Sequence, residues 1–585
     1  MKNPFAPLKI LCCLLIGYGS LNAQTSTPQF EWAKGFGGFF GDVGNTISVD
    51  FEGNIITAGT FTESVNFNPS ADTTTIFGQA GDAFITKHNA QGELIWVKHF
   101  GGEMQDGVLS ATSDESGNIY LAGYFSLTVD FNSGNDVFEL TSSGGFDIFI
   151  LKLNANGEFQ WVKKIGGTGL YDWAEEIIYS PLDGSLHITG HFSETLNFET
   201  NEGILSFTSI NNSTDIFVAR YSNSGNFSWA KHMGSDDFDA GMGVAIDKQN
   251  NVYVTGIFAN TANFNIGLNP VELTSNGQAD IFICKLKTDG SLTWVKGFGD
   301  EGQDWGYDIA VDFMDNVLIT GMFSGNIDFN PDTPNVNVLI SQLWDILVLK
   351  LNTNGSYIWA RNFGGVEFDW GNAIAVDKLG DIYTTGWFSK TADFNPSDAI
   401  FELTAGGHYD IFIHKLDASG NFVWAGQLEG NQIFDLSDNM GNEITVDDNF
   451  NIYTTGQFHT YMDCDPGPNV SNIIAVDDFG SGFFYQDVFI QKMSQEIFVS
   501  IDNQSAENQI KYYPNPTSGN LNIELNTEFK SINVSIIDVT GKVVHQQSFN
   551  NINLINIHLD ISNGLYFIQL SEKNNPIGHF KILKM

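Results

Sequence analysis

The sequence predicts an all-β protein in which a seven-bladed β-propeller precedes a small β-sandwich. A unit of 64 to 68 residues recurs seven times. Each unit holds four short runs rich in Ile, Val, Phe, Tyr and Thr, separated by clusters of Gly, Asn, Asp and Pro, a pattern typical of strands joined by turns. Repeated four-stranded sheets bury their faces against one another by closing a ring around an axis. A second set of alternating strands, without the landmarks of the unit, follows in residues 511–585.

The repeat is clearest between Trp359 and Trp424. Its four expected strands cover residues 373–377, 381–386, 410–416 and 421–428. Asp and Gly bracket the connections after the first and third strands, as they do in tight reversals that need a positive φ. The fourth strand of each unit carries one tryptophan, at Trp32, Trp96, Trp161, Trp229, Trp294, Trp359 and Trp424. We interpret these as core residues, so Trp359→Ala should cost about 3 to 5 kcal/mol.

The two ends of the repeat array predict how the ring closes. An aspartate opens the third strand of every unit, at Asp82, Asp147, Asp215, Asp280, Asp345, Asp410 and Asp487. The last of these strands ends at Met493 with no tryptophan strand after it, whereas residues 30–36 form a tryptophan strand with no third strand before it. We therefore expect the N-terminal strand to complete the last blade, which removes the exposed edges of an open array.

Residues 1–23 are predicted to be an export signal. Lys2 and Lys9 precede an apolar run over residues 10–16, and Ala23 supplies the small residue that a signal peptidase requires. The run is too short for a transmembrane helix, and no later stretch approaches the roughly 20 apolar residues of a membrane span.

The remaining chain is predicted to consist of a propeller over 24–493, a linker over 494–510 and a C-terminal domain over 511–585. Cys284 and Cys464 fall in well-separated repeats. Because a disulfide needs Cα atoms within about 7 Å, we expect none.

The C-terminal domain carries motifs at fixed places along six expected strands. These motifs are Tyr513-Pro514-Asn515-Pro516, Gly519-Asn520-Leu521, Asp538 to Gly541, Gly564-Leu565-Tyr566 and Lys581-Ile582-Leu583-Lys584. In this order they resemble the C-terminal sorting domain of the type IX secretion system of Bacteroidetes. The resemblance implies that this machinery carries the chain across the outer membrane, that the domain is removed, and that the protein is released or attached to surface lipopolysaccharide.

The repeats themselves resemble bacterial propeller repeats found in such exported proteins. Residues 451–456 (NIYTTG) and 420–424 (GNFVW) are the most typical segments. This second resemblance implies a fold but no shared activity.

Charge narrows the range of partners. The chain carries 69 acidic and 26 basic residues, a formal net charge of −43. Nucleic acid and anionic membrane surfaces are excluded as partners because such a surface repels them. Cations are favoured as ligands, because the negative charge attracts them.

Acidic residues recur in the loops that join one unit to the next. Six of these loops carry an aspartate five residues before a strand position, at Asp42, Asp106, Asp172, Asp239, Asp304 and Asp369, and Asn439 fills the seventh slot. Clustered carboxylate and amide oxygens suit Ca²⁺, which takes six to eight oxygen ligands. The alternative is that these residues cap turns and tie each loop to its neighbour. Calcium is therefore a possible cofactor, and no other is expected.

A tryptophan directly follows three of the loop aspartates, at Trp173, Trp305 and Trp370. Aromatic faces beside acidic and amide groups can stack on sugar rings, which makes these residues candidates for glycan binding. The alternative is that they pack between blades.

No catalytic residues are predicted, because the carboxylates repeat with the fold and the histidines form no metal-binding spacing. We therefore favour a non-enzymatic binding module for a glycan or protein, secreted or at the outer cell surface. The alternative is an extracellular polysaccharide hydrolase or lyase with its site on the loop face. The irregular seventh repeat is the place for such a site, at Asp435, Asp438, Asp463 and Asp465. A purely structural role in a surface layer is a third possibility.

Overall fold

The computed structural model describes residues 21–25, 27–69, 74–132, 134, 136–267, 269–331, 337–430, 438–476, 485–501, 511–513, 517–538, 543–562, 564–572 and 575–584. Most of the predicted signal, residues 1–20, and most of the predicted linker, residues 502–510, lie outside this part. The chain forms two compact units, of which Thr27–Gln495 is one, and Met1–Ser26 together with Glu496–Met585 is the other.

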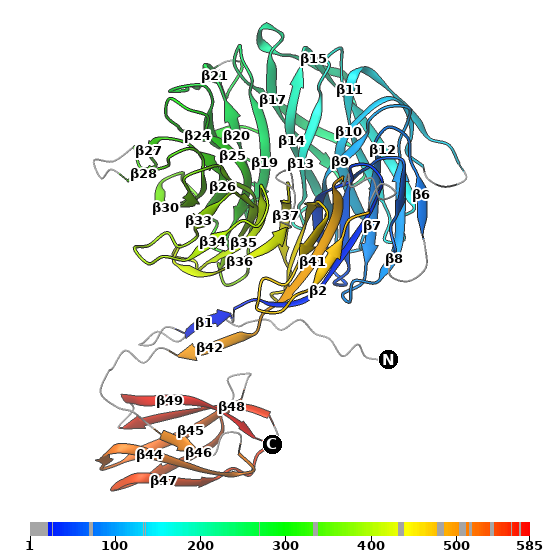
Figure 1. Cartoon of the computed structure of the whole chain (residues 1–585). Coiled ribbons are helices and arrows are strands. Elements are labelled where there is room, and N and C mark those ends of the chain that lie inside the picture. The colour runs from blue at the N-terminus through cyan, green and yellow to red at the C-terminus, as the bar shows by residue number, and fades with distance from the viewer. Residues whose placement is uncertain are drawn as a thin grey trace. The chain divides into compact units, whose positions relative to one another are not determined.

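The first unit is a ring of seven antiparallel blades of four strands each (Figure 1). We name the strands of each blade a, b, c and d in the order in which they pair. In blades 5, 6 and 7 the d strand also pairs with a hairpin of the following blade, which extends the sheet to six strands. Blade 1 contains β3 (Val43–Val49), β4 (Ile55–Phe61), β7 (Asp82–His88) and β8 (Leu94–Phe100). Blade 2 contains β9 (Gly107–Ser113), β10 (Ile119–Asp130), β11 (Glu139–Leu153) and β12 (Phe159–Ile165). Blade 3 contains β13 (Trp173–Tyr179), β14 (Ser185–Ser193), β17 (Thr214–Ser222) and β18 (Phe227–Met233).

The remaining blades repeat this order. Blade 4 contains β19 (Ala240–Ile246), β20 (Val252–Phe258), β23 (Asp280–Leu286) and β24 (Leu292–Phe298). Blade 5 contains β25 (Trp305–Val311), β26 (Val317–Phe323), β29 (Asp345–Leu351) and β30 (Tyr357–Gly365). Blade 6 contains β31 (Asp369–Val376), β32 (Ile382–Phe388), β35 (Asp410–Leu416) and β36 (Phe422–Gly430). Blade 7 contains β37 (Met440–Val446), β38 (Ile452–Phe458), β41 (Asp487–Ser494) and β2 (Gln29–Gly38).

The connections between b and c strands carry small hairpins in six blades. These are β5 (Ser64–Asn66) with β6 (Thr75–Phe77), β15 (Thr195–Thr200) with β16 (Gly203–Thr208), β21 (Thr261–Asn263) with β22 (Glu272–Thr274), β27 (Asn326–Asp328) with β28 (Val338–Ile340), β33 (Thr391–Asp393) with β34 (Glu402–Thr404), and β39 (Tyr461–Asp463) with β40 (Asn472–Ile474). In blade 2, β10 and β11 continue as long strands instead. A 3₁₀ turn, Ile210–Asn212, is the only helical element in the described ranges, and no described helix is long and apolar enough to span a membrane.

Two sets of contacts close the ring: those between neighbouring a strands, and the pairing of the first strand of the propeller with the last. Each a strand contacts the a strands of both neighbouring blades, and β37 contacts β3. The N-terminal β2 pairs antiparallel with β41, so the last blade takes its d strand from the start of the chain. The all-β propeller that the sequence predicts is confirmed.

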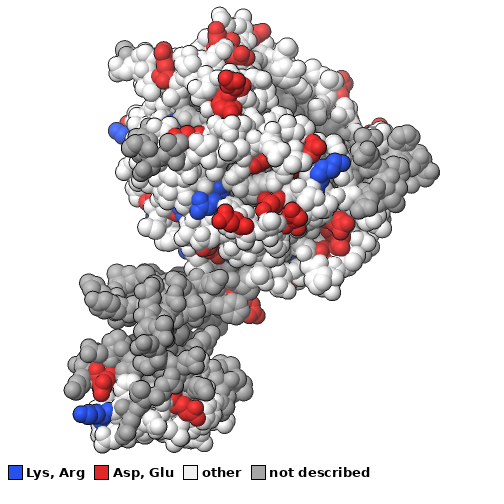
Figure 2. Space-filling view, turned by 60° about the vertical axis from the view of Figure 1, so that its left-hand side comes forward, with Lys and Arg blue, Asp and Glu red and all other residues white. Residues whose placement is uncertain are grey.

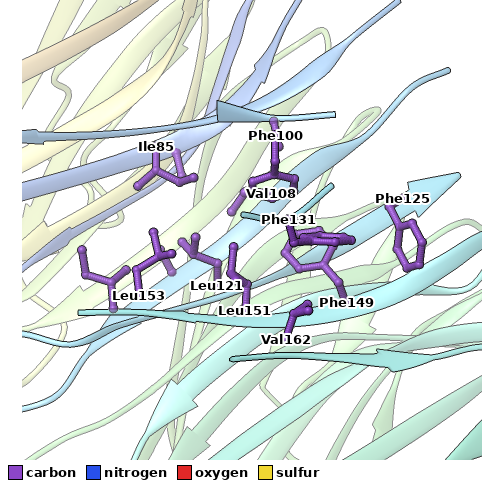
Figure 3. Packing of buried hydrophobic residues seen from close by; sticks show 14 of the residues in the cluster. Ile85, Phe100, Val108, Leu121, Phe125, Phe131, Phe149, Leu151, Leu153 and Val162 are labelled. Atoms are coloured by element: carbon purple, nitrogen blue, oxygen red, sulfur yellow. The ribbon is translucent and has the colours of Figure 1, made fainter. Parts of the chain in front are cut away.

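Apolar clusters fill the spaces between blades. In the cluster between blades 1 and 2, Phe149 lies 5.2 Å from both Phe100 and Phe131, measured between ring centroids (Figure 3). The d-strand tryptophans join these clusters, but only Trp359 is buried, at 7% exposure; the other six are half-buried. Trp359 lies under the c–d turn of the next blade, where a Cβ on Gly420 would come within 2.9 Å of the indole. The turn therefore requires glycine, which also has a φ of +77° there.

Each c strand carries a basic side chain that bonds to the next blade: a lysine in six blades and Arg220 in blade 3. Lys350 donates to Ala418 O at 3.0 Å, in the c–d turn of blade 6. Blade 7 has no such turn, because its d strand comes from the N-terminus. The side chain of Gln495 takes the place of the missing carbonyl and accepts from Lys415 Nζ at 2.7 Å. Gln495 also donates to Tyr383 Oη at 3.0 Å, so one buried side chain joins the end of β41 to blade 6.

The second unit contains a two-sheet sandwich. One sheet consists of β43 (Lys511–Tyr513), β44 (Asn520–Phe529) and β47 (Ile552–His558), and the other of β46 (Val543–Phe549), β45 (Ile532–Asp538), β48 (Gly564–Glu572) and β49 (Asn575–Lys584). Both sheets contribute to one buried core. In the same unit β1 (Leu21–Thr25) pairs with β42 (Ile497–Ile501). In the propeller, Cys284 and Cys464 are buried and unbridged, as predicted.

Candidate functional site

The d–a and b–c loops emerge at one end of the ring, which we call the mouth. The predicted loop aspartates lie behind this surface and are fully buried. Asp369 accepts Gly365 N–H at 2.6 Å and Ser389 N–H at 3.1 Å, and its own N–H donates to Trp344 O at 3.0 Å. It thereby joins the end of a d strand, the end of a b strand and the start of a c strand. Two backbone N–H groups are bonded in the same way by Asp42, Asp106, Asp172, Asp239 and Asp304.

Burial sets the protonation of these carboxyl groups. Desolvation raises the pKa of Asp369 to about 7, against the lowering effect of the two N–H groups. Among the described residues, no group of three or more His, Cys, Asp or Glu side chains is placed to hold a metal ion. Calcium at the loop aspartates stays a prediction, and their oxygens already face N–H donors.

Two of the three predicted ligand-binding tryptophans come together. The rings of Trp305 and Trp370 lie 5.9 Å apart, and Trp370 lies 5.2 Å from both Trp344 and Trp387. Trp387 lies 4.2 Å from Tyr409. We call this set the aromatic strip: Trp305, Tyr307, Trp344, Phe368, Trp370, Trp387 and Tyr409. Trp387 is buried and the other six are half-buried, so the strip combines mutual packing with exposed ring surface.

Trp173 belongs to a separate aromatic group in blades 2 to 4. Its ring stacks on Tyr124 at 4.7 Å and lies 5.7 Å from the His191 ring. Tyr171 and Phe238, in the neighbouring loops, are 52% and 44% exposed. The three predicted tryptophans therefore do not form one site.

Three carboxylates that the sequence analysis missed line the inner strands. The position four residues after each loop aspartate is Thr46, Ser110, Glu176, Gly243, Asp308, Ala373 or Glu443. Asp308 accepts Ile309 N–H at 2.6 Å and Ile374 N–H at 2.7 Å, and Glu443 accepts Ile444 N–H at 2.9 Å. Glu176 accepts Val244 N–H. The expectation that carboxylates merely repeat with the fold is wrong at this position.

The three carboxylates influence one another although their blades are not neighbours. Burial raises the pKa of Asp308 to about 7. Burial, together with the charge of Asp308, raises the pKa values of Glu176 and Glu443 well above their usual range. We call Glu176, Asp308 and Glu443 the channel carboxylates, since their blades meet only across the axis. Aligning the seven repeats at this position is the signal that would have found them.

The irregular seventh repeat contributes to the mouth as well. Asp438 forms an exposed ion pair with His408 at 2.8 Å, and the His408 ring lies 3.9 Å from Tyr409 of the aromatic strip. Asp463 accepts N–H groups of its own loop from Asp465 and Ser471, at 3.1 and 2.8 Å. Asp435 lies outside the described residues.

Comparison with known proteins identifies the C-terminal unit. Residues 511–584 match the family model described as a secretion system C-terminal sorting domain. The chain therefore ends in a type IX sorting domain and is an exported protein, secreted or at the cell surface.

The chain is also similar to a repeat-containing protein. An uncharacterized WD repeat-containing protein, L264, of Acanthamoeba polyphaga mimivirus is 23% identical over 511 residues, which span 73% of this chain. The match covers only 36% of the length of that relative.

Two solved structures are also similar. A Bacteroides thetaiotaomicron protein of unknown function has a TM-score of 0.26 and 10% identity, covering 80% of this chain and 98% of its own. A DUF4221 family member from Bacteroides vulgatus has a TM-score of 0.26 and 11% identity, covering 67% and 93%.

Proposed function

We propose that this exported propeller is a binding module whose ligand contacts the aromatic strip at the mouth. The observation that carries the proposal is the succession of ring contacts from Trp305 through Trp370 to Tyr409, at 4.2 to 5.9 Å, in which most rings stay half-exposed. Large, rigid aromatic side chains with exposed faces are typical anchors of binding surfaces.

An extracellular glycan is the ligand class that suits this surface best. Aromatic faces stack on the apolar faces of sugar rings, while nearby polar groups hold the hydroxyls. The His408 and Asp438 pair beside Tyr409 offers such polar groups at the edge of the strip. A protein partner would use the same anchors.

The test is a glycan array followed by calorimetry with the full exported chain. We expect Trp344→Ala and Trp370→Ala to weaken binding at least tenfold, since each removes a face of the strip. Phe51→Ala is the matched control, because this aromatic is 80% exposed in an a–b turn, at the end opposite the mouth. If both mouth variants bind like the unaltered protein, the strip is not the site.

A polysaccharide hydrolase or lyase is the second candidate, favoured by the channel carboxylates. A carboxyl group with a pKa near 7, beside others whose pKa values are also raised, has the properties of a general acid or base. Asp308 would take that role. The test is turnover of extracellular polysaccharides by the full chain and by Asp308→Asn. Retained activity in the variant would remove Asp308 from catalysis.

Calcium would act as a structural ion in this proposal. Calorimetric titration with Ca²⁺ and thermal melting in excess chelator test it together. Heat on titration with a lower melting temperature in chelator supports a metal-stabilised mouth. If the melting temperature does not change in chelator, Asp369 and its equivalents serve only to accept backbone N–H groups.

A further inference from the structure

Four positions of each repeat lie where one blade meets the next at the mouth. They are the residue before the c-strand aspartate, the two residues that flank the loop aspartate, and the b-strand residue paired with the second of these. At two of the seven junctions all four positions carry a ring. We call these sets the blade-3 platform, which is Phe146, Tyr171, Trp173 and His191, and the blade-6 platform, which is Trp344, Phe368, Trp370 and Trp387. Each of the other five junctions has at most one ring at these positions.

The two platforms share one internal arrangement. In the blade-3 platform the Phe146 ring lies 6.3 Å from Tyr171 and 6.2 Å from Trp173, and Trp173 lies 5.7 Å from His191. The equivalent three distances in the blade-6 platform are 4.8, 5.2 and 5.2 Å. The b-strand member is buried in both. The mouth therefore carries two copies of one constellation, three blades apart.

The fold does not require rings at these positions. Between blades 7 and 1 the four positions are Gln486, Gly41, Val43 and Thr60. The backbone contact across that junction is nevertheless kept: Asp42 N–H donates to Gln486 O at 2.7 Å, as Asp369 N–H donates to Trp344 O at 3.0 Å. Because the same frame forms with and without rings, the platforms are additions to it, and their twofold occurrence points to a ligand.

Both platforms present apolar surface to solvent. In the blade-3 platform Tyr171 is 52% exposed, and its neighbour Leu170 is 62% exposed. In the blade-6 platform Phe368 and Trp370 are half-buried, and Val366, two residues before Phe368, is 58% exposed. Ring faces that remain in contact with water can stack on the apolar face of a sugar.

Two equivalent platforms on one mouth suit a ligand that presents the same unit more than once. We propose that the blade-3 platform is a second glycan site, equivalent to the blade-6 platform within the aromatic strip, and that the ligand is a polysaccharide long enough to occupy both. Binding at one platform raises the effective concentration of the next units at the other, so a polymer binds more tightly than a short fragment. This proposal rests on the binding function proposed above and names its ligand class.

Charge selects among polysaccharides. A glutamate stands beside each platform: Glu175 Oε1 lies 3.2 Å from His191 Nδ1, and Glu367 directly precedes Phe368. The whole chain carries a net charge of −43, and Figure 2 shows acidic side chains spread over the face drawn, with few basic ones among them. Sulfated and uronic-acid chains would meet like charge. The ligand class is therefore a neutral polysaccharide.

A comparison of short and long neutral glycans tests the proposal. Glucomannan and arabinoxylan are the long probes, and mannotetraose, cellotetraose and xylotetraose, which are fragments of their backbones, are the short ones. Calorimetry with the full exported chain should show two sites per chain for a tetrasaccharide that binds. The parent polysaccharide should bind at least tenfold more tightly than its fragment. A single tetrasaccharide site, or equal affinity for fragment and parent, overturns the proposal.

Two variants at the same repeat position locate the sites. Tyr171→Ala and Phe368→Ala should each reduce the tetrasaccharide sites from two to one and should each remove the extra affinity for the polysaccharide. Gln105→Ala, at the exposed equivalent position between blades 1 and 2, is the matched control and should keep both sites. Two sites in Tyr171→Ala overturn the second site. If melting curves show that Tyr171→Ala is destabilised, Tyr171→Gln takes its place.

The outcomes also separate this proposal from the binding function. One tetrasaccharide site that is lost in Phe368→Ala and kept in Tyr171→Ala overturns the second site and leaves the binding function standing. If none of these probes binds, the neutral-polysaccharide proposal falls, while binding of another glycan on the array would uphold the binding function. If nothing binds at all, both fall.

Discussion

Two positions four residues apart in each repeat have opposite characters. The loop position is aspartate in six repeats, is fully buried and bonds the backbone of three strands. The channel position changes from repeat to repeat, and where it is acidic, at Glu176, Asp308 and Glu443, the side chain is half-buried. The comparison teaches that residues repeated around this ring build it, whereas candidate functional groups occupy positions where the repeat is broken.

The largest effect should come from a repeated residue in the core. Trp359→Ala should lower the free energy of unfolding by about 3 to 5 kcal/mol, because it leaves a cavity under the Gly420 turn. Trp294, the half-buried equivalent in blade 4, is the control, and its replacement should cost less. Urea unfolding followed by tryptophan fluorescence measures both. If both variants lose the same free energy of unfolding, the greater burial of Trp359 adds nothing to stability.

Removing a loop aspartate should rank next. Asp369→Ala strands the N–H groups of Gly365 and Ser389, and unsatisfied buried donors cost about 1 to 3 kcal/mol each. Asp369→Asn should cost less, because it keeps an acceptor toward Ser389 as Asn439 does toward His459 at 2.9 Å. Denaturant unfolding of both variants is the measurement. If Asp369→Ala is as stable as the unaltered protein, the bonds from Asp369 to the two N–H groups do not stabilise the fold.

Gln495 challenges the comparison, because it occurs once and yet its role is structural. Gln495→Leu removes bonds to Lys415 and Tyr383, so the free energy of unfolding should fall by about 1 to 3 kcal/mol. Gln495→Glu keeps an acceptor for the lysine and should recover part of the loss. Hydrogen exchange in β32, β35 and the end of β41 should rise first, since the lost bonds join these strands. If hydrogen exchange in the Gln495→Leu variant is unchanged, the bonds of Gln495 do not hold the end of β41 in place.

The smallest effect concerns pH and the channel position. The folded-state pKa of Asp308 is raised to about 7, so the folded protein binds more protons than the unfolded chain between about pH 4 and 7. The contribution of Asp308 to stability is therefore full below its unfolded pKa and is lost as the pH rises toward 7. Asp308→Asn should reduce the fall in melting temperature between pH 5 and pH 8. Asp369 has a similar pKa. Its Asn variant shows how much of the change in melting temperature with pH comes from the loop aspartates.

Much of the fold follows from the sequence because its signals are local and repeated. Strand runs, turn glycines and the tryptophan of each unit predict the blades, and the unpaired strand at each end of the array matches the observed pairing of β2 with β41. The C-terminal motifs identify the sorting domain in the same way, since short-range patterns carry them. The candidate site was predicted only in part: Trp305 and Trp370 meet, but Trp173 lies in another group.

Tertiary structure decided the rest, because it depends on how the ring brings separate blades together. The loop aspartates look like surface ligands in the sequence, yet backbone N–H groups from two strand ends enclose each of them. Glu176, Asp308 and Glu443 lie in blades 3, 5 and 7, and only closure around the axis places their charges near one another. The sequence by itself determined the repeat, its closure and the export of the chain. The geometry of the closed ring decided which acidic residues are buried and bond the backbone, and which face the channel.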